Sequence, residues 1–203
     1  MTIWLLTNLA PWLPMCPLEI GATVFGLWSV WCYVKENVWS WPTGLLNVLL
    51  YIALFWNGKL YAETVLQIIY VVLQIYGWWQ WMRGGEQHAG VHITRTSRRL
   101  WLLLGAVALV SVLPLVYVLR HWTDSTVPWW DATPTILSLI AQWMISKKKL
   151  ENWYVWILVD CISIPLFIYK GFFLTAGLYA VFLALCVKGW FAWAKKYRSS
   201  VAG

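Results

Sequence analysis

Apolar runs, each near the length of a bilayer crossing, recur along the chain and are separated by short polar or basic segments. A helix needs about 20 mostly apolar residues to cross the hydrocarbon core. The N-terminal segment 1–17 is shorter and interrupted by prolines, so we expect it to lie at the membrane interface. The pattern predicts an all-α integral membrane protein with seven transmembrane helices at 18–34, 39–56, 61–82, 99–119, 132–146, 151–169 and 172–194.

Composition agrees with a membrane protein. Of the 203 residues, 61% are hydrophobic and 11% are charged, whereas a soluble domain carries about 25% charged residues. The net charge of +7 is explained by basic loops on one membrane face, so the lipid bilayer is the expected partner and nucleic acid is not. The four cysteines are scattered and the histidines fall in loops, so no metal or other cofactor is predicted.

The basic residues indicate the orientation in the membrane. One side is predicted to hold only Lys59, Arg120 and Lys170, and Lys188 lies near a helix end. Because basic loops stay in the cytoplasm, the N-terminus is predicted outside and the C-terminus inside. Residues 83–98 then form a cytoplasmic loop, 120–131 an outer loop and 195–203 a cytoplasmic tail. The basic side holds Lys35, Arg83, Arg95, Arg98, Arg99, Lys147, Lys148, Lys149, Lys195, Lys196 and Arg198.

The sequence also repeats itself. Residues 18–82 align with 132–194, which predicts two three-helix repeats joined by a linker helix at 99–119. The linker restores the direction of the chain, so the repeats are expected to be parallel, as in some transporters. Near the helix ends "GWWQW" and "GWFAW" align at an offset of 112, and upstream the offset is 113. The aligned pairs are Gly77 with Gly189, Trp78 with Trp190, Trp81 with Trp193, Lys35 with Lys148, Leu45 with Leu158 and Gly58 with Gly171.

Asn47 and Asp160 are the main candidates for a solute site. They align at offset 113, and each lies at the centre of its predicted span. Polar and ionisable groups at mid-bilayer are costly and usually face a cavity or a partner. The competing interpretation is that they bond to backbone or to each other and only fix helix packing.

Other side chains extend this candidate site. Gln67, Gln74 and the inner tryptophans share one helical face, and Thr43, Asn47 and Tyr51 are stacked on another. Amides, a carboxylate and flat aromatic rings suit a flat, polar, cationic solute, although interhelical bonding is the alternative for each glutamine. Trp28, Gln142 and Trp156 complete the predicted lining. The tryptophans at the inner helix ends are expected to anchor at the interface, and four of them to close the inner end of the solute path as well: Trp78, Trp81, Trp190 and Trp193.

The stretches "WSWPTGLLNVLLY" (39–51) and "LQIYGWWQW" (73–81), with the repeated layout, resemble the PnuC family of bacterial nicotinamide riboside transporters. The resemblance covers about 18–197. It implies a SWEET-like 3+1+3 bundle in the bacterial cytoplasmic membrane, and facilitated diffusion of the nucleoside by alternating access. It also implies that a separate cytoplasmic kinase phosphorylates the nucleoside and so traps it. Because the second repeat has Asp in place of Asn and no glutamine in its last helix, the pocket is expected to be asymmetric.

Several alternatives stay open. Asp160 could carry a proton in a symporter, or the chain could be a SWEET-like uniporter of another small polar solute. A retinal protein would use Lys188, but this lysine lies at the inner end, where it can reach the interface. No HExxH, GxSxG or paired midplane carboxylates occur, so an enzyme is not predicted. No oligomer interface is evident, although a homo-oligomer is compatible with the sequence.

Overall fold

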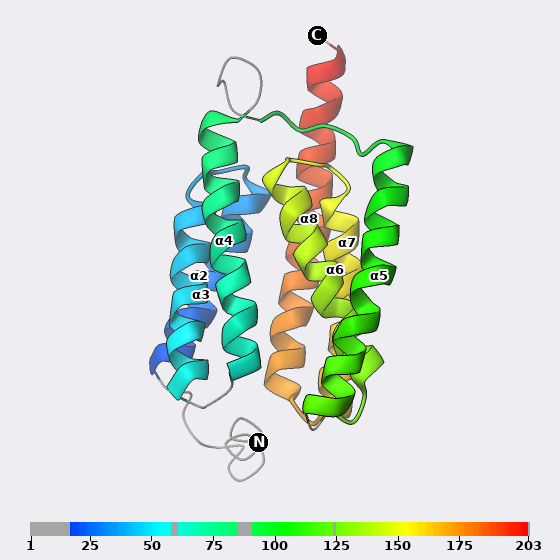
Figure 1. Cartoon of the computed structure of the whole chain (residues 1–203). Coiled ribbons are helices and arrows are strands. Elements are labelled where there is room, and N and C mark those ends of the chain that lie inside the picture. The colour runs from blue at the N-terminus through cyan, green and yellow to red at the C-terminus, as the bar shows by residue number, and fades with distance from the viewer. Residues whose placement is uncertain (1–16, 58–60, 85–90, 124, 203) are drawn as a thin grey trace. The chain divides into compact units, whose positions relative to one another are not determined.

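The computed structural model describes residues 17–57, 61–84, 91–123 and 125–202, and these are almost entirely helical (Figure 1). The all-α prediction is confirmed, and the predicted interfacial segment 1–17 lies almost wholly outside the described residues. The chain divides into two compact units, residues 1–91 and 92–203. The described helices are α2 (Pro17–Val34), α3 (Ser40–Asn57), α4 (Tyr61–Arg83), α5 (Arg98–Trp122), α6 (Pro128–Ser146), α7 (Asn152–Tyr169) and α8 (Phe173–Ala202).

Within the described residues, three helical stretches are long and apolar enough to cross a membrane: Arg98–Trp122, Asn152–Tyr169 and Phe173–Ser200. Leu18–Val34 in α2 is apolar but shorter. In α4 the apolar sequence is interrupted by Glu63, Gln67, Gln74 and Gln80. Two predicted loops are shorter than expected. The loop predicted at 120–131 is shorter because α5 continues to Trp122 and α6 begins at Pro128, whose ring suits the first helical turn. Most of the predicted tail 195–203 continues α8.

In the first unit, α3 packs against both α2 and α4. The turn between α2 and α3 places Glu36 at a φ of 55°, in the left-handed region. Beside this turn, the rings of Tyr33, Trp41 and Trp81 meet edge to face, with centroids 5.1 to 5.9 Å apart. Trp41 is fully buried, and its ring occupies the space that a side chain at Gly77 would need. The glycine therefore lets α3 and α4 approach closely around an indole ring.

The second unit contains the same contact. The rings of Trp153 and Trp193 meet edge to face at 5.4 Å, and the Trp153 ring lies against Gly189. In this unit α7 packs against α6 and α8, and α5 packs against α6. Leu104 on α5 joins an apolar cluster made by α6 and α7, whose other buried members are Ala141, Met144 and Val155.

Helix bounds and contacts recur at one offset. Ser40 and Asn152 start α3 and α7, and Asn57 and Tyr169 end them, so both pairs are 112 residues apart. Trp41 with Trp153, and the positive-φ residues Glu36 with Lys148, have the same separation. The predicted upstream offset of 113 is therefore wrong by one residue. A run of three lysines at 147–149 and the leucine-rich helices allowed either alignment.

This correction changes the predicted pairing of Asn47 with Asp160. At offset 112 the counterpart of Asn47 is Val159, and the counterpart of Asp160 is Val48. One residue along a helix rotates a side chain by about 100°. The two polar residues therefore occupy different faces of their helices.

The segment before α5 is held on the turn between α6 and α7. The backbone N–H of Thr94 donates to Lys148 O at 3.1 Å, and the N–H of Leu150 donates to Thr94 O at 2.9 Å. The buried carboxylate of Glu151 accepts from the backbone N–H and the hydroxyl of Thr96, both at 2.8 Å, and from Arg95 Nε at 3.3 Å. Part of the predicted cytoplasmic loop is thus a fixed strap, residues 92–97.

We predict that Gly77→Ala and Gly189→Ala each destabilise the protein. The new methyl group would overlap a tryptophan ring that is fully packed, and overpacking costs about 1–3 kcal/mol. Gly177→Ala in α8 is the matched control because no atom lies within 4 Å of its added carbon. This control should be neutral or stabilising by up to about 1 kcal/mol, since alanine favours helix. Thermal unfolding in detergent measures all three. Equal melting temperatures for Gly177→Ala and Gly189→Ala would contradict the close packing of the Trp153 ring against Gly189.

Candidate functional site

Gln74 is the most enclosed amide of the first unit. It is 7% exposed, and its Oε1 accepts a hydrogen bond from Tyr33 Oη at 3.0 Å. A side chain at Gly44 would collide with the Gln74 amide and with Ser29 Oγ. Glycine at this position thus leaves room for the amide between α3 and α4. No described group accepts from Gln74 Nε2, so a donor is left for a solute.

Asn47 is half-buried on α3 and donates from Nδ2 to Ala22 O on α2 at 2.6 Å. This bond is the packing role that competes with solute binding. The Oδ1 atom of Asn47 remains available, since no described donor bonds to it. The hydroxyl of Thr43 donates to Trp39 O at 2.7 Å, within its own helix. Gln67 is half-buried, and Tyr51 stacks on Phe55 with centroids 5.4 Å apart.

Asp160 is the predicted solute-binding residue that is most buried in the second unit. It is 2% exposed and shares a side-chain hydrogen bond with Cys186 on α8. Its Oδ2 is buried and lacks a partner among the described residues. A buried carboxylate oxygen without a donor is unfavourable unless a partner completes it. Gln142 on α6 is 4% exposed, and Trp156 packs half-buried on the apolar cluster of α5, α6 and α7.

The structure thus divides the predicted site residues between two units. In the first it brings together Gln74, Tyr33 and Gly44, and in the second Asp160 and Cys186. Tyr33 and Cys186 were not predicted. Cys186 occupies the position equivalent to Gln74 at offset 112, so the repeat itself could have identified it.

The predicted closing tryptophans lie in two environments. Trp81 and Trp193 are 4% and 1% exposed, each within its own unit's aromatic cluster. Trp78 and Trp190 are half-buried, and Trp190 packs on Tyr154 with centroids 4.0 Å apart. Trp28 is 53% exposed and stacks on Phe25. Trp81 and Trp193 hold helices together inside a unit, whatever else they do.

No metal centre is evident where the structure describes the chain, since no three His, Cys, Asp or Glu side chains gather there. Among the predicted site residues, the polar atoms without a described partner include the amide donor of Gln74, the amide acceptor of Asn47 and the carboxylate acceptor Asp160 Oδ2. Such a set can bind a small polar solute by hydrogen bonds.

Comparison with known proteins gives the context of this site. Residues 16–195 match the family model described as nicotinamide mononucleotide transporter. The nicotinamide riboside transporter PnuC of Escherichia coli (strain K12) is 24% identical, over 89% of this chain and 86% of that protein. PnuC of Neisseria mucosa is 28% identical, over 86% of this chain and 70% of that protein.

Two further matches bear on fold and substrate. The crystal structure of the vitamin B3 transporter PnuC superposes with a TM-score of 0.70, at 27% identity, and covers 96% of this chain and 85% of that one. The riboflavin/roseoflavin transporter RibM of Streptomyces davaonensis is 27% identical, over 86% of this chain and 83% of that protein. All of these proteins are transporters rather than enzymes.

Proposed function

The chain belongs to the PnuC family of membrane transporters, and we propose that it carries nicotinamide riboside. The observation that carries this proposal is the similarity to proteins named nicotinamide riboside transporter over 86% to 89% of the chain. The polar atoms left available inside the helices agree with a solute that forms several hydrogen bonds.

We infer the finer mechanism from the family resemblance and the repeat. Two parallel three-helix repeats, α2–α4 and α6–α8, joined by α5, would form a SWEET-like bundle. The recurrence of helix bounds and tryptophan–glycine contacts at offset 112 supports the repeat. The solute crosses by alternating access and facilitated diffusion. A separate cytoplasmic kinase traps it by phosphorylation, without a stable complex with the transporter.

The proposed location is the bacterial cytoplasmic membrane, with the N-terminus outside and the C-terminus inside. The basic ends of α4 and α8 and the strap at 92–97 support this orientation, because basic segments remain in the cytoplasm.

The chemistry of the solute matches the available groups. Nicotinamide riboside has a carboxamide, a cationic pyridinium ring and ribose hydroxyls. In the first unit, Gln74 Nε2 can donate to a carboxamide and Asn47 Oδ1 can accept from one. In the second unit, Asp160 Oδ2 can accept from a ribose hydroxyl or balance a positive ring charge. We propose the remaining lining from the predicted set: Gln67, Gln142, Tyr51, Trp28 and Trp156, with inner closure by Trp78, Trp81, Trp190 and Trp193. Thr43, also predicted, is left out because its hydroxyl is bonded within its own helix.

A second substrate is favoured by one observation. RibM, a riboflavin/roseoflavin transporter, is as similar to this chain as the PnuC proteins are. Riboflavin also combines a flat polar ring with hydroxyl groups, but its ring carries no positive charge. The two solutes therefore differ in their need for the Asp160 carboxylate.

We expect the purified protein in liposomes to exchange labelled nicotinamide riboside in a counterflow assay without any ion gradient. Unlabelled nicotinamide riboside should compete, and riboflavin at the same concentration should not. An imposed pH gradient should leave the initial rate unchanged, because the proposed transport is not coupled to protons. If riboflavin competed and unlabelled nicotinamide riboside did not, the chain would instead be a riboflavin transporter. If a pH gradient raised the initial transport rate, a proton symporter would be favoured.

Binding measured by calorimetry should locate the site. Asp160→Asn and Gln74→Leu should each weaken nicotinamide riboside binding by about tenfold or more, since each removes a charge or hydrogen bond worth at least about 1.4 kcal/mol. Tyr33→Phe frees Gln74 Oε1 and should cause a smaller loss.

Thr43→Val is the matched control for these variants, because the Thr43 hydroxyl is used within its own helix and its loss leaves the available groups intact. Its affinity should stay within about threefold of the parent, less than one hydrogen bond is worth. Full affinity in both Asp160→Asn and Gln74→Leu would move the site away from these residues.

A further inference from the structure

The basic end of α8 borders a cavity that includes none of the residues proposed to bind the solute and shares only Trp190 with the proposed inner closure. The cavity has a volume of about 150 Å³, and all of its lining lies in the second unit. The strap contributes Arg95, the α6–α7 turn contributes Leu150, and α8 contributes Trp190, Ala194, Tyr197 and Arg198. A larger hollow of about 490 Å³ continues along α8 past Lys195 and Ser199.

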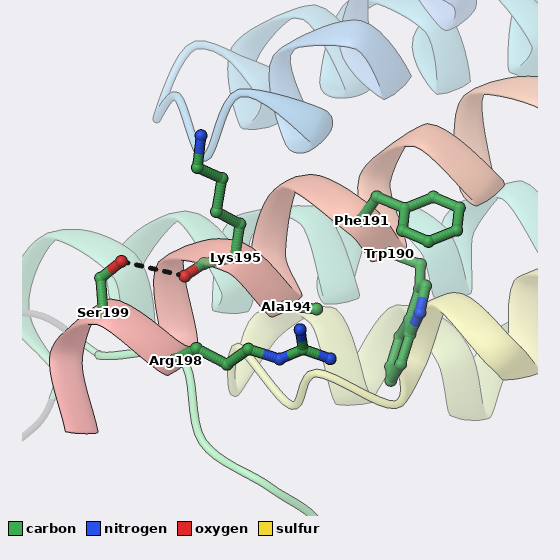
Figure 2. Close-up of a pocket in the computed structure, with 6 residues that line it drawn as sticks. All are labelled: Trp190, Phe191, Ala194, Lys195, Arg198 and Ser199. Atoms are coloured by element: carbon green, nitrogen blue, oxygen red, sulfur yellow. Dashed lines mark hydrogen bonds between the residues drawn. The ribbon is translucent and has the colours of Figure 1, made fainter. Parts of the chain in front are cut away.

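The spacing along α8 creates the hollow. Trp190, Ala194 and Arg198 are four residues apart and share one helical face. Figure 2 shows the Arg198 side chain running past the small Ala194 toward the Trp190 ring, while Lys195 points away from that ring. Alanine between an indole and a guanidinium leaves space for a ligand with one flat or apolar part and one anionic part.

Two guanidinium groups line the smaller cavity from different elements. Arg95 is oriented by its Nε bond to Glu151, and that bond leaves its terminal nitrogens available. Arg198 is exposed and forms no ion pair with any described residue. Glu151 offsets one positive charge, but its oxygens are already occupied by Arg95 and Thr96. The cavity therefore has a net positive lining, fixed on one side by the strap.

We propose that this cavity is a phosphate-binding site, formed by Arg95 and Arg198 with the ring of Trp190 as its apolar wall. Guanidinium groups bind phosphate oxygens in pairs of hydrogen bonds, which suits two arginines facing one cavity. The phosphate can belong to a soluble nucleotide, whose base would stack on the indole, or to the headgroup of an anionic lipid. Both ligands present the same anion beside an apolar group.

Native mass spectrometry of the purified full-length protein tests the site with two probes, adenosine monophosphate and phosphatidylglycerol, against phosphatidylcholine as the neutral reference. Arg198→Gln should reduce binding of the effective probe about tenfold, as expected for loss of a charged hydrogen-bonding partner. Lys196→Gln is the matched control: it removes the same charge from the same helix but does not line the cavity. It should retain the parent's binding.

Ala194→Leu tests the cavity itself without altering charge. It fills the space between Trp190 and Arg198 and should weaken binding as much as Arg198→Gln does. Binding of the nucleotide alone, or of the lipid alone, identifies the source of the phosphate, and either result supports the site. Equal losses in Arg198→Gln and Lys196→Gln would show only diffuse charge attraction and overturn the proposal. So would absence of binding by both probes, or displacement of the nucleotide by excess nicotinamide riboside, which would assign it to the transport path.

Discussion

The contact on which each unit depends is a tryptophan ring seated against a helical glycine. Trp41 lies on Gly77 and Trp153 on Gly189, and no other residue at either glycine would admit the ring. Such a contact fixes how far one helix is advanced along its neighbour. Gln74 and Gly44 each lie three residues from this contact, about 4.5 Å along the helix axis, so the amide reaches the gap that the second glycine provides. The contact between Trp41 and Gly77 thereby positions the Gln74 amide within the first unit.

The same framework holds a different polar centre in the second unit. At offset 112, Cys186 replaces Gln74, Ile145 replaces Tyr33 and Asp160 replaces Val48. In the first unit the Tyr33 hydroxyl donates to the Gln74 amide. In the second unit the Asp160 carboxylate is instead hydrogen-bonded to the Cys186 thiol. The tryptophan–glycine packing is the same in the two units, and any change there costs packing energy. The polar positions, by contrast, differ between the two units.

The sequence predicted the helices well because their signal is strong: long apolar runs ended by lysine, glycine or proline. All seven described helices agree with the predicted runs to within a few residues, apart from the extended ends of α6 and α8. Two things were not predictable. Two leucine-rich helices can be aligned equally well at offsets that differ by one residue. The sequence alignment therefore paired Asp160 with Asn47, whereas the helix bounds pair it with Val48. The strap on Glu151 depends on backbone hydrogen bonds between segments about 55 residues apart, and composition contains no trace of these. Likewise, Gln74 and Asp160 were predicted as polar groups within helices, whereas their hydrogen-bond partners Tyr33 and Cys186 were not, because a tyrosine or a cysteine does not stand out in an apolar run.

Hydrogen-bonding capacity distinguishes structural from solute-binding polar groups inside a membrane protein. A polar side chain that only fixes packing is expected to be satisfied by the protein, because an unpaired polar atom away from water is costly. The indole N–H groups of Trp41 and Trp153 are exceptions, since both are buried without a described partner while their rings pack. Thr43 meets the expectation, since its hydroxyl is bonded within its own helix. Asn47, Gln74 and Asp160 do not, since each forms one bond that orients it and retains one atom that the described chain leaves unpaired. A carrier needs this combination. In the proposed site, the first bond would hold the side chain in place so that little entropy is lost on binding, and the free atom would gain its partner from the solute.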